Sequence, residues 1–307
     1  MLKILSDSKD IQGASGEIRA GGTDLHDRYR LGVSSGAIID IHKLNFGGFV
    51  KNEDGSICIG ANVTIDAVGQ HASIQSGYGA LSKAANGLAT TQIRWSASFG
   101  GSLLQKTRCS YFRHPYLPCT KKGDSLCSGK NGYHPNGVIF DKGGCPHPHP
   151  STLATALLAY NATVKTTERE MPIAELYGDG SSHNRDHLLN ENELLTHIIL
   201  PPAIAGERTA YFRSISRFEA EWPIVECSIR LLVENDIITD AGIGVGGVSQ
   251  IPLRLNNVEA ALIGKAASQS TIEEAANLSA ENANPLPQTK WKVEIMVNTI
   301  LHTLEWH

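Results

Sequence analysis

The chain has 307 residues, a formal net charge of −4 and an apolar fraction of 41%. This length allows two domains, or one domain with subdomains, and the composition is that of a globular protein rather than a disordered or fibrous one. No apolar run approaches the roughly 20 residues that a bilayer span requires, so we expect no membrane-spanning segment. The slight acidity disfavours nucleic acid as a partner.

The first sixty residues have the pattern of a βαβ unit followed by a hairpin. Turn residues separate short apolar runs, which is typical of alternating strands and helices. We expect a strand over 17–20, a glycine turn over 21–23, a helix over 24–31, a strand over 37–41 and a hairpin over 50–60.

The middle of the chain predicts helices that are interrupted by a long irregular loop. Thr64 and Ser151 are suitable N-caps, because Ser and Thr side chains accept hydrogen bonds from the first backbone N–H groups of a helix. We expect helices over 65–72, 79–88 and 153–160, a second glycine turn over 98–102, and a boundary in the polar segment 177–186.

The last 120 residues predict a sheet with helices. The segment 242–247, GIGVGG, superficially resembles a dinucleotide fingerprint, but such a motif opens a helix, and here a strand and a proline follow. We therefore interpret it as a glycine-rich strand. We expect strands over 194–200, 208–216 and 237–248, and helices over 224–233, 257–263, 270–282 and 287–304.

Four of the six cysteines lie in the irregular loop, namely Cys109, Cys119, Cys127 and Cys145. A long loop without periodicity needs a source of stability, and thiolate ligation of a metal centre supplies one. Disulfides need an oxidising compartment, and structural zinc usually uses closely spaced cysteine pairs, which are missing here. Those two alternatives and four unlinked thiols stay open, and an iron–sulfur cluster is the interpretation that the residues favour.

Two glycine turns suggest a site for an anion. Gly21-Gly22-Thr23 and Gly100-Gly101-Ser102 each offer backbone N–H groups and a hydroxyl at a chain reversal. Such turns form concavities that bind anions, and two of them together could hold a diphosphate. Two ordinary tight turns are the alternative.

The glycine turns stand in motifs that resemble a known family. The segments IRAGGTDL at 18–25 and QIRWSASFGGSLLQ at 92–105 are similar to the FAD-binding subunit of molybdenum hydroxylases, the group of xanthine dehydrogenase, aldehyde oxidoreductase and carbon monoxide dehydrogenase. ELLT at 193–196 and IGVGGV at 243–248, the latter followed by PLR at 252–254, extend the resemblance over nearly the whole chain.

The resemblance implies an α+β protein. It would have the two-subdomain FAD-binding fold of the vanillyl-alcohol-oxidase (PCMH) type, followed by a C-terminal domain of antiparallel sheet and helices. We expect the FAD-binding domain over 1–180, with a βαβ subdomain over about 1–50 and an α/β subdomain over about 51–180. The insert would span 106–148 and the C-terminal domain 187–307.

The resemblance also assigns the FAD contacts. Gly21, Gly22 and Thr23 would hold the pyrophosphate, and Ser151 would face the ribityl chain. Leu195 would pack on the isoalloxazine ring, while Arg213 stands where the family often has Lys. The flanking residues and the second half of the cradle would be Ile18, Arg19, Ala20, Asp24, Leu25, Ser98, Gly101 and Ser102.

The sequence departs from the family pattern at three positions. The family usually has Asn where Trp95 and Ser102 stand, and Asp where Thr152 stands. Ser102 retains a hydrogen-bonding group with shorter reach. Thr152 lacks the carboxylate that would accept hydrogen bonds from FAD hydroxyls, so the resemblance does not assign that contact to this chain.

The insert makes the resemblance more specific, because it points to one subgroup of the family. TRCSYFR at 107–113 and the cysteines before HPS at 149–151 are similar to the flavin subunit of periplasmic-type aldehyde oxidoreductases, which carries an extra [4Fe–4S] cluster in this loop. The resemblance thus implies that Cys109, Cys119, Cys127 and Cys145 are cluster ligands.

The function that the resemblance implies is electron transfer. A large molybdenum-cofactor subunit would oxidise the substrate, an aldehyde by analogy, and a small [2Fe–2S] subunit would pass electrons to FAD in this chain and on to an external acceptor. The three would form a heterotrimer or a dimer of trimers. The flavin subunit of a xanthine, CO or hydroxybenzoyl-CoA type dehydrogenase and a stand-alone FAD oxidase are the alternatives.

The N-terminus becomes polar too early for a signal peptide. We therefore expect a cytoplasmic protein, or a periplasmic one if a partner with a signal exports the folded complex.

Overall fold

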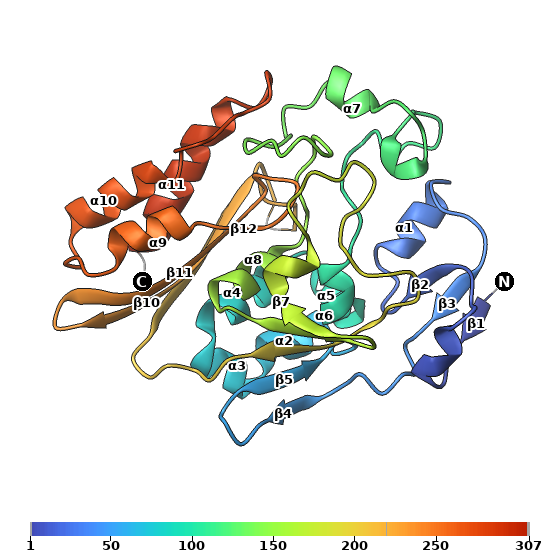
Figure 1. Cartoon of the computed structure of the whole chain (residues 1–307), viewed down its shortest axis with the longest axis horizontal. Helices are drawn as coiled ribbons and strands as arrows, with labels where there is room; N and C mark the ends of the chain where they lie inside the picture. Colours follow the sequence, from blue (N-terminus) through green and yellow to red (C-terminus); the bar gives the residue numbers. More distant parts are fainter. Residues whose placement is uncertain (1, 219, 306–307) are drawn as a thin grey trace.

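The computed structural model describes residues 2–218 and 220–305, and these residues form three sheets with helices packed on them (Figure 1). The N-terminal sheet is parallel, in the order β1-β3-β2, and α1 connects β2 to β3. The predicted βαβ unit is therefore confirmed. The elements are β1 (Leu2–Ile4), the short 3-10 helix η1 (Ser8–Ile11), β2 (Glu17–Arg19), α1 (Leu25–Arg30) and β3 (Ile38–Asp40).

The middle sheet has five antiparallel strands in the order β4-β5-β8-β6-β7. The hairpin that Asp54-Gly55 predicts is present, because β4 and β5 pair with Phe49 opposite Ile59. The strands are β4 (Phe49–Lys51), β5 (Ile57–Gly60), β6 (Thr163–Thr166), β7 (Glu170–Pro172) and β8 (Leu195–Leu200).

Helices pack with this sheet around the largest apolar core of the described residues. The expected helices over 65–72, 79–88 and 153–160 are present, whereas α3 and α5 were not expected. The helices are α2 (Ile65–Gln70), α3 (Ala72–Gly77), α4 (Gly79–Gly87), α5 (Thr91–Ser96), α6 (Phe99–Leu103), α8 (Thr152–Ala159) and the 3-10 helix η3 (Ile173–Leu176).

The second glycine turn is a short helix rather than a turn. Phe99 to Leu103 form α6, and the Ser98 hydroxyl accepts a hydrogen bond from the Gly101 N–H at 3.2 Å. Two adjacent glycines made a turn the simpler expectation, but the Ser98 N-cap satisfies a free donor of the first helical turn and stabilises the helix.

Strand β8 belongs to the middle sheet. An expected boundary at 187 would assign it to the C-terminal domain, but β8 pairs with β5 on one side and with β6 on the other. We propose that the boundary lies after β8, because a strand in the interior of a sheet is part of that sheet's domain.

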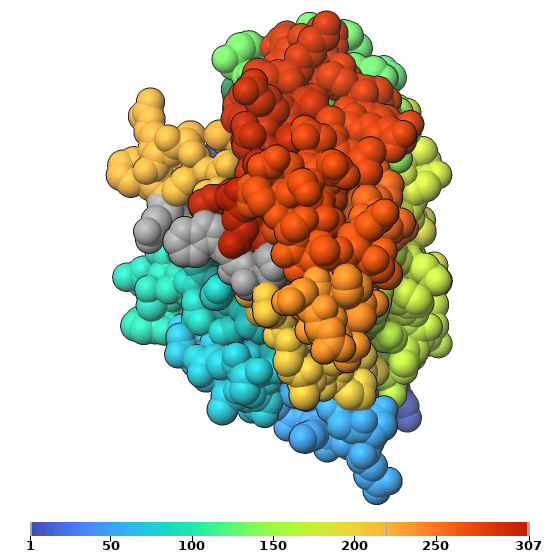
Figure 2. Space-filling model, turned by 90° about the vertical axis from the view of Figure 1, so that its left-hand side faces the viewer, coloured from blue at the N-terminus to red at the C-terminus, as the bar shows by residue number. Residues whose placement is uncertain are grey.

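The C-terminal sheet is antiparallel, in the order β12-β11-β10-β9. Helices α9–α11 pack on one face and α8 on the other (Figure 1), and the orange and red helices form much of the surface in Figure 2. The elements are β9 (Arg208–Ser214), β10 (Val225–Glu234), β11 (Ile237–Gly246), β12 (Leu253–Arg254), α9 (Asn256–Leu262), α10 (Gln269–Leu278) and α11 (Trp291–Glu305).

The helix predicted over 224–233 is wrong. This segment, with Cys227, is the strand β10, which lies between β9 and β11. Helices cover both of its faces, so the residues from Val225 to Leu231 are all buried. Its middle nevertheless alternates, with apolar Val225, Cys227, Ile229 and Leu231 in one apolar core and the buried polar residues Glu226, Ser228 and Arg230 between them. The adjacent apolar residues at 224–225 and 231–233 obscure this period of two, which is the signal of a strand.

The glycine-rich segment at 242–246 lies in strand β11, as predicted. A Cβ at Gly244 would lie 2.0 Å from the Thr155 carbonyl oxygen, and one at Gly242 would lie 2.1 Å from the Ala159 carbonyl oxygen. The glycines therefore allow the α8 backbone to lie directly on the strand.

Gly244→Ala is expected to lower the free energy of unfolding by about 3 kcal/mol, because α8 must move to admit a methyl group into a packed core. Urea unfolding measures the change. Gly87→Ala is the matched control, since a Cβ there meets nothing within 4 Å. Equal stability of the two variants would contradict the packing argument.

Candidate functional site

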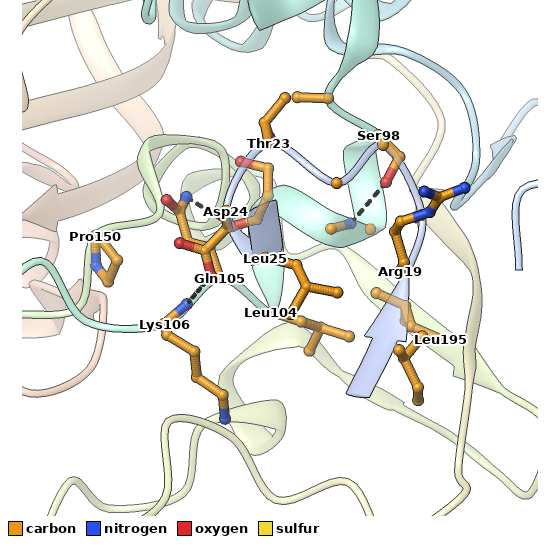
Figure 3. A pocket seen from close by; sticks show the side chains of 18 of the residues that line it. Arg19, Thr23, Asp24, Leu25, Ser98, Leu104, Gln105, Lys106, Pro150 and Leu195 are labelled. Carbon is orange, nitrogen blue, oxygen red and sulfur yellow. Dashed lines mark hydrogen bonds between the residues drawn. The ribbon is translucent and has the colours of Figure 1, made fainter. Parts of the chain in front are cut away.

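A cavity of about 790 Å³ lies where residues of all three sheet regions meet (Figure 3). Its size falls within the range of about 300–1,000 Å³ that is usual for small-molecule and cofactor sites. The β2–α1 turn, the start of α6, β8 and the C-terminal region all contribute to its wall. Figure 3 shows Arg19 and Leu195 on one side and Pro150 and Lys106 on the other.

The first glycine turn touches the segment before α6. A Cβ at Gly21 would lie 1.9 Å from the Ser96 carbonyl oxygen, and the Ser96 hydroxyl donates to the Gly21 carbonyl oxygen at 3.0 Å. Gly22 has a φ of +76°, a conformation that favours glycine. The first glycine turn therefore packs backbone to backbone against Ser96 and Ala97, directly before the second glycine segment at 98–102, and both glycine segments line the cavity.

The turn leaves backbone donors available. The first intrahelical hydrogen bond of α1 runs from the His26 N–H to the Gly22 carbonyl oxygen, at 2.9 Å. The N–H groups of Thr23, Asp24 and Leu25 precede it and have no carbonyl acceptor within the helix. Thr23 also contributes a hydroxyl to the cavity wall. Such a group of donors suits the oxygen atoms of an anion.

The structure brings together all but one of the residues that the resemblance assigns to FAD. Ser151 is the exception: it is buried and caps α8, where its hydroxyl accepts from the Ala154 N–H, while its neighbours Pro150 and Thr152 line the cavity. The lining residues among those expected are Ile18, Arg19, Ala20, Gly21, Gly22, Thr23, Asp24, Leu25, Ser98, Gly101, Ser102, Leu195 and Arg213.

Lys106, Arg108 and Trp222 are among the lining residues that were not expected. The Arg108 guanidinium lies 4.4 Å from the centre of the Trp222 ring, so the insert and the β9–β10 connection meet at the cavity. The two residues are more than 100 positions apart in the sequence, and only the fold reveals this contact.

Asp24 ties the insert to the first glycine turn. Its carboxylate lies 2.9 Å from Arg108 and 2.5 Å from Arg113, both of the insert. Burial raises the pKa of Asp24, but the charges of Arg108 and Arg113 and the hydrogen bond from Arg113 lower it more, so the net pKa lies below the ordinary value. The ionised carboxylate is therefore the stable form.

Asp24→Asn is expected to lower the free energy of unfolding near neutral pH by about 3 kcal/mol, because the largely buried guanidinium groups of Arg28, Arg108 and Arg113 lose a shared partner. The lowered pKa of Asp24 means that its contribution is present above the unfolded pKa of about 4 and lost as pH falls through the folded value.

Urea unfolding at a series of pH values from about 2.5 to 7 tests this. The difference between the wild type and Asp24→Asn should shrink toward acid pH. A difference that is constant with pH would contradict the assignment. Asp27→Asn is the control, since Asp27 pairs with Arg113 and with the exposed Arg30 but is more accessible than Asp24.

The insert holds its four cysteines in one region. Cys109 and Cys119 are buried in the same apolar cluster, and both interact electrostatically with Cys127, while Cys145 interacts with Cys109. The insert has little regular structure, with the 3-10 helix η2 (Thr120–Lys122) and α7 (Ser128–Asn131). All four are free thiols.

Burial disfavours the ionised form of three of these thiols. It raises the pKa of Cys109 and Cys119, and it raises the pKa of Cys145 to about 12. Backbone N–H groups donate to three of the sulfurs, from Phe112 and Tyr111 to Cys109, from Lys121 to Cys119 and from His147 to Cys145, and these bonds oppose the shift. The same donors would stabilise thiolates bound to a metal centre.

In the described parts of the chain, no group of three or more His, Cys, Asp and Glu side chains is arranged to hold a metal ion. Nor does any described helix have the length and apolar character that crossing a membrane requires.

Comparison with known protein families identifies the class. Residues 3–203 match the FAD binding domain in molybdopterin dehydrogenase, and residues 210–294 match the C-terminal domain of CO dehydrogenase flavoprotein. The chain therefore belongs to the family of FAD-binding subunits of molybdopterin dehydrogenases, which are oxidoreductases. The expected family and α+β fold are confirmed, and a C-terminal domain follows the FAD-binding domain.

Two relatives of this chain are also FAD-binding subunits. The chain is 29% identical to the aldehyde oxidoreductase FAD-binding subunit PaoB of Escherichia coli (strain K12), over 86% of this chain and 84% of that protein. It is 25% identical to the nicotinate dehydrogenase FAD-subunit of Eubacterium barkeri, over 88% of this chain and 78% of that protein.

Solved structures share the fold. A chain of carbon monoxide dehydrogenase from Hydrogenophaga pseudoflava superposes with a TM-score of 0.77 at 18% identity, covering 99% of this chain and 96% of that chain. A chain of quinoline 2-oxidoreductase from Pseudomonas putida 86 gives a TM-score of 0.74 at 15% identity, covering 99% and 95%.

Proposed function

We propose that the chain is the FAD-containing electron-transfer subunit of an aldehyde oxidoreductase complex. A molybdenum-cofactor subunit would oxidise the aldehyde, and a [2Fe–2S] subunit would pass the electrons to FAD in this chain and then to an external acceptor. The observation that carries the proposal is the cavity of about 790 Å³ in which the two glycine segments meet. The likeness to the aldehyde oxidoreductase subunit of E. coli supports the substrate class.

The residues of the cavity fit FAD. Backbone N–H groups and the hydroxyl of Thr23 would bind the pyrophosphate at the first glycine turn, and Ser98, Gly101 and Ser102 would complete the cradle at α6. Leu195 offers an apolar surface for the isoalloxazine ring. The glycines exclude side chains from the contact between the two segments, so the bound diphosphate would touch the backbone directly.

FAD supplies the redox chemistry, since it accepts two electrons and can donate them singly. The protein's own residues bind the cofactor, orient it and set its electrostatic surroundings. Arg213 and Lys106 both line the cavity and place positive charge there. Positive charge near a flavin stabilises its anionic reduced form, so these two residues are suited to raise the reduction potential.

We propose that the cysteines of the insert hold a [4Fe–4S] cluster. The shared location of the four thiols and the backbone N–H groups that donate to three of them support this. A cluster places iron and sulfide between its ligands, so its four cysteines need not approach as closely as those around a single ion. Because ligation requires thiolates, loading of the insert would release protons.

Expression of the chain alone and together with molybdenum-cofactor and [2Fe–2S] subunits tests the proposed function. We expect one FAD for each chain, and reduction of that flavin by an aldehyde only in the complex. A complex without flavin, or a lone chain that oxidises aldehydes, would overturn the proposal. Reduction of the bound flavin by another substrate class would retain the subunit role and replace the aldehyde assignment.

A further inference from the structure

A buried carboxylate lies directly behind the cavity wall. Glu226, on β10, is 2% exposed, and its Oε2 accepts a hydrogen bond from the Tyr211 hydroxyl at 2.8 Å. Its carboxylate also hydrogen-bonds with Thr152 and Thr155 of α8. Thr152 itself lines the cavity, so one hydroxyl stands between the carboxylate and the space proposed for FAD.

A glycine on the facing strand leaves space for this carboxylate. A Cβ at Gly246 would lie 2.5 Å from Oε1 of Glu226 and 2.5 Å from the Thr155 hydroxyl, so the facing strand β11 presents only backbone. Burial raises the pKa of Glu226 to about 7, although the hydrogen bonds and the charge of Arg213 oppose the shift. A group with this desolvation cost needs an explanation beyond packing.

Glu259 shows a purely structural solution in the same domain. It is also buried, but three contacts of 2.9 to 3.1 Å join its carboxylate to the Arg254 guanidinium, and it does not line the cavity. Glu226 receives neutral hydroxyls instead, and its charge is offset by Arg213, which lines the cavity too. The polar cluster of Glu226 is therefore continuous with the cavity.

The chemistry of a hydroxyl determines what this arrangement does. Thr152 has one hydrogen to donate and two lone pairs. When it donates to the ionised carboxylate of Glu226, its oxygen presents only lone pairs to the cavity. The wall then accepts hydrogen bonds, and it suits a ligand with several hydroxyl groups.

We propose that Glu226 is a positioning residue that orients the Thr152 hydroxyl as an acceptor for the ribityl hydroxyl groups of FAD. The inference rests on the proposed FAD site and adds a residue to it. In this way a carboxylate on β10 acts through Thr152, at the position where the family resemblance led us to expect Asp. The groups that face Glu226 are Tyr211 and Arg213 of β9, Thr152 and Thr155 of α8 and Gly246 of β11.

A double-mutant cycle on the full chain tests the proposal. FAD is removed and then titrated back at about pH 8.5, where Glu226 is ionised, and quenching of flavin fluorescence gives the Kd. We expect Thr152→Val and Glu226→Gln each to weaken FAD binding by about tenfold. The double variant should bind like Thr152→Val alone, because Glu226 acts only through that hydroxyl.

Two controls separate this effect from a loss of structure. Glu259→Gln should retain the wild-type Kd for FAD although it loses a buried ion pair, and Thr152→Ser, which keeps the hydroxyl, should stay within about twofold of the wild type. Thermal unfolding shows whether each variant folds. If Glu226→Gln does not fold, the comparison of Thr152→Val with Thr152→Ser still decides whether the hydroxyl acts.

The outcomes are distinguishable. A wild-type chain that does not bind FAD refutes the proposed function. If the wild type binds FAD, then unchanged binding by Thr152→Val or by a folded Glu226→Gln overturns only the role of Glu226. Losses of affinity that add in the double variant also overturn it, because two independent contributions to FAD binding would add.

Discussion

Gly21→Ala is expected to abolish FAD binding, with the Kd raised at least about 100-fold. The added Cβ would lie 1.9 Å from the Ser96 carbonyl oxygen and 2.8 Å from its carbonyl carbon. Both atoms belong to the backbone, so no side chain can rotate to relieve the overlap. The first glycine turn must move away from Ser96, and the proposed diphosphate cradle opens with it.

The measurement is an FAD titration of the flavin-free chain, combined with far-ultraviolet circular dichroism to show that the fold persists. Gly47→Ala is the matched control, because a Cβ there meets nothing within 4 Å. Ser96→Ala removes only the hydrogen bond to Gly21 and should cost less than about tenfold in affinity. If Gly21→Ala binds FAD within about threefold of the wild type, the cradle is misplaced.

Cys119→Ser is expected to remove the proposed [4Fe–4S] cluster and leave some FAD bound. The thiol is buried beside Cys109 in the insert, and a serine hydroxyl is a poor replacement for a cluster thiolate. Iron and acid-labile sulfide should fall from about four of each per chain to below about one. FAD remains in part, because the glycine segments lie outside the insert.

Cys58→Ser is the matched control, since Cys58 is a free thiol on β5 of the middle sheet. It should retain full iron and sulfide content. Iron that is unchanged in Cys119→Ser would refute that ligand, and a wild type that contains zinc and no iron would refute the cluster. Anaerobic reconstitution should be slower at lower pH, because the raised pKa values of Cys109 and Cys145 keep both thiols protonated.

Local sequence signals were sufficient to predict the elements whose boundaries are marked by neighbouring turn or capping residues. The βαβ unit around Gly21, the hairpin at Asp54-Gly55 and the capped helix after Ser151 each carry turn or capping residues next to a clear apolar pattern. Two segments of the cavity wall could also be found from local motifs, at 18–25 and 98–102. Each motif is a short continuous stretch of the chain, so it does not depend on contacts between distant residues.

Where local patterns were ambiguous, the prediction was wrong. The strand β10 was predicted as a helix, because the adjacent apolar residues at 224–225 and 231–233 obscure the apolar–polar alternation that its middle does show. For Ser151, which the resemblance assigns to the ribityl chain, the structure adds that its hydroxyl caps α8 and that the neighbouring Thr152 lines the cavity. A one-residue shift at the start of a helix rotates the side chain by about 100°, which no motif specifies.

The sequence by itself determined the family, the α+β class and two of the segments that surround the cavity, because these depend on residues that are neighbours along the chain. Only the tertiary structure decided the contacts between distant residues. It brought Asp24 to Arg108 and Arg113, and Glu226 to the back of Thr152. Such pairs form when sheets and helices pack against each other, and a single sequence carries no record of which distant side chains that packing brings together.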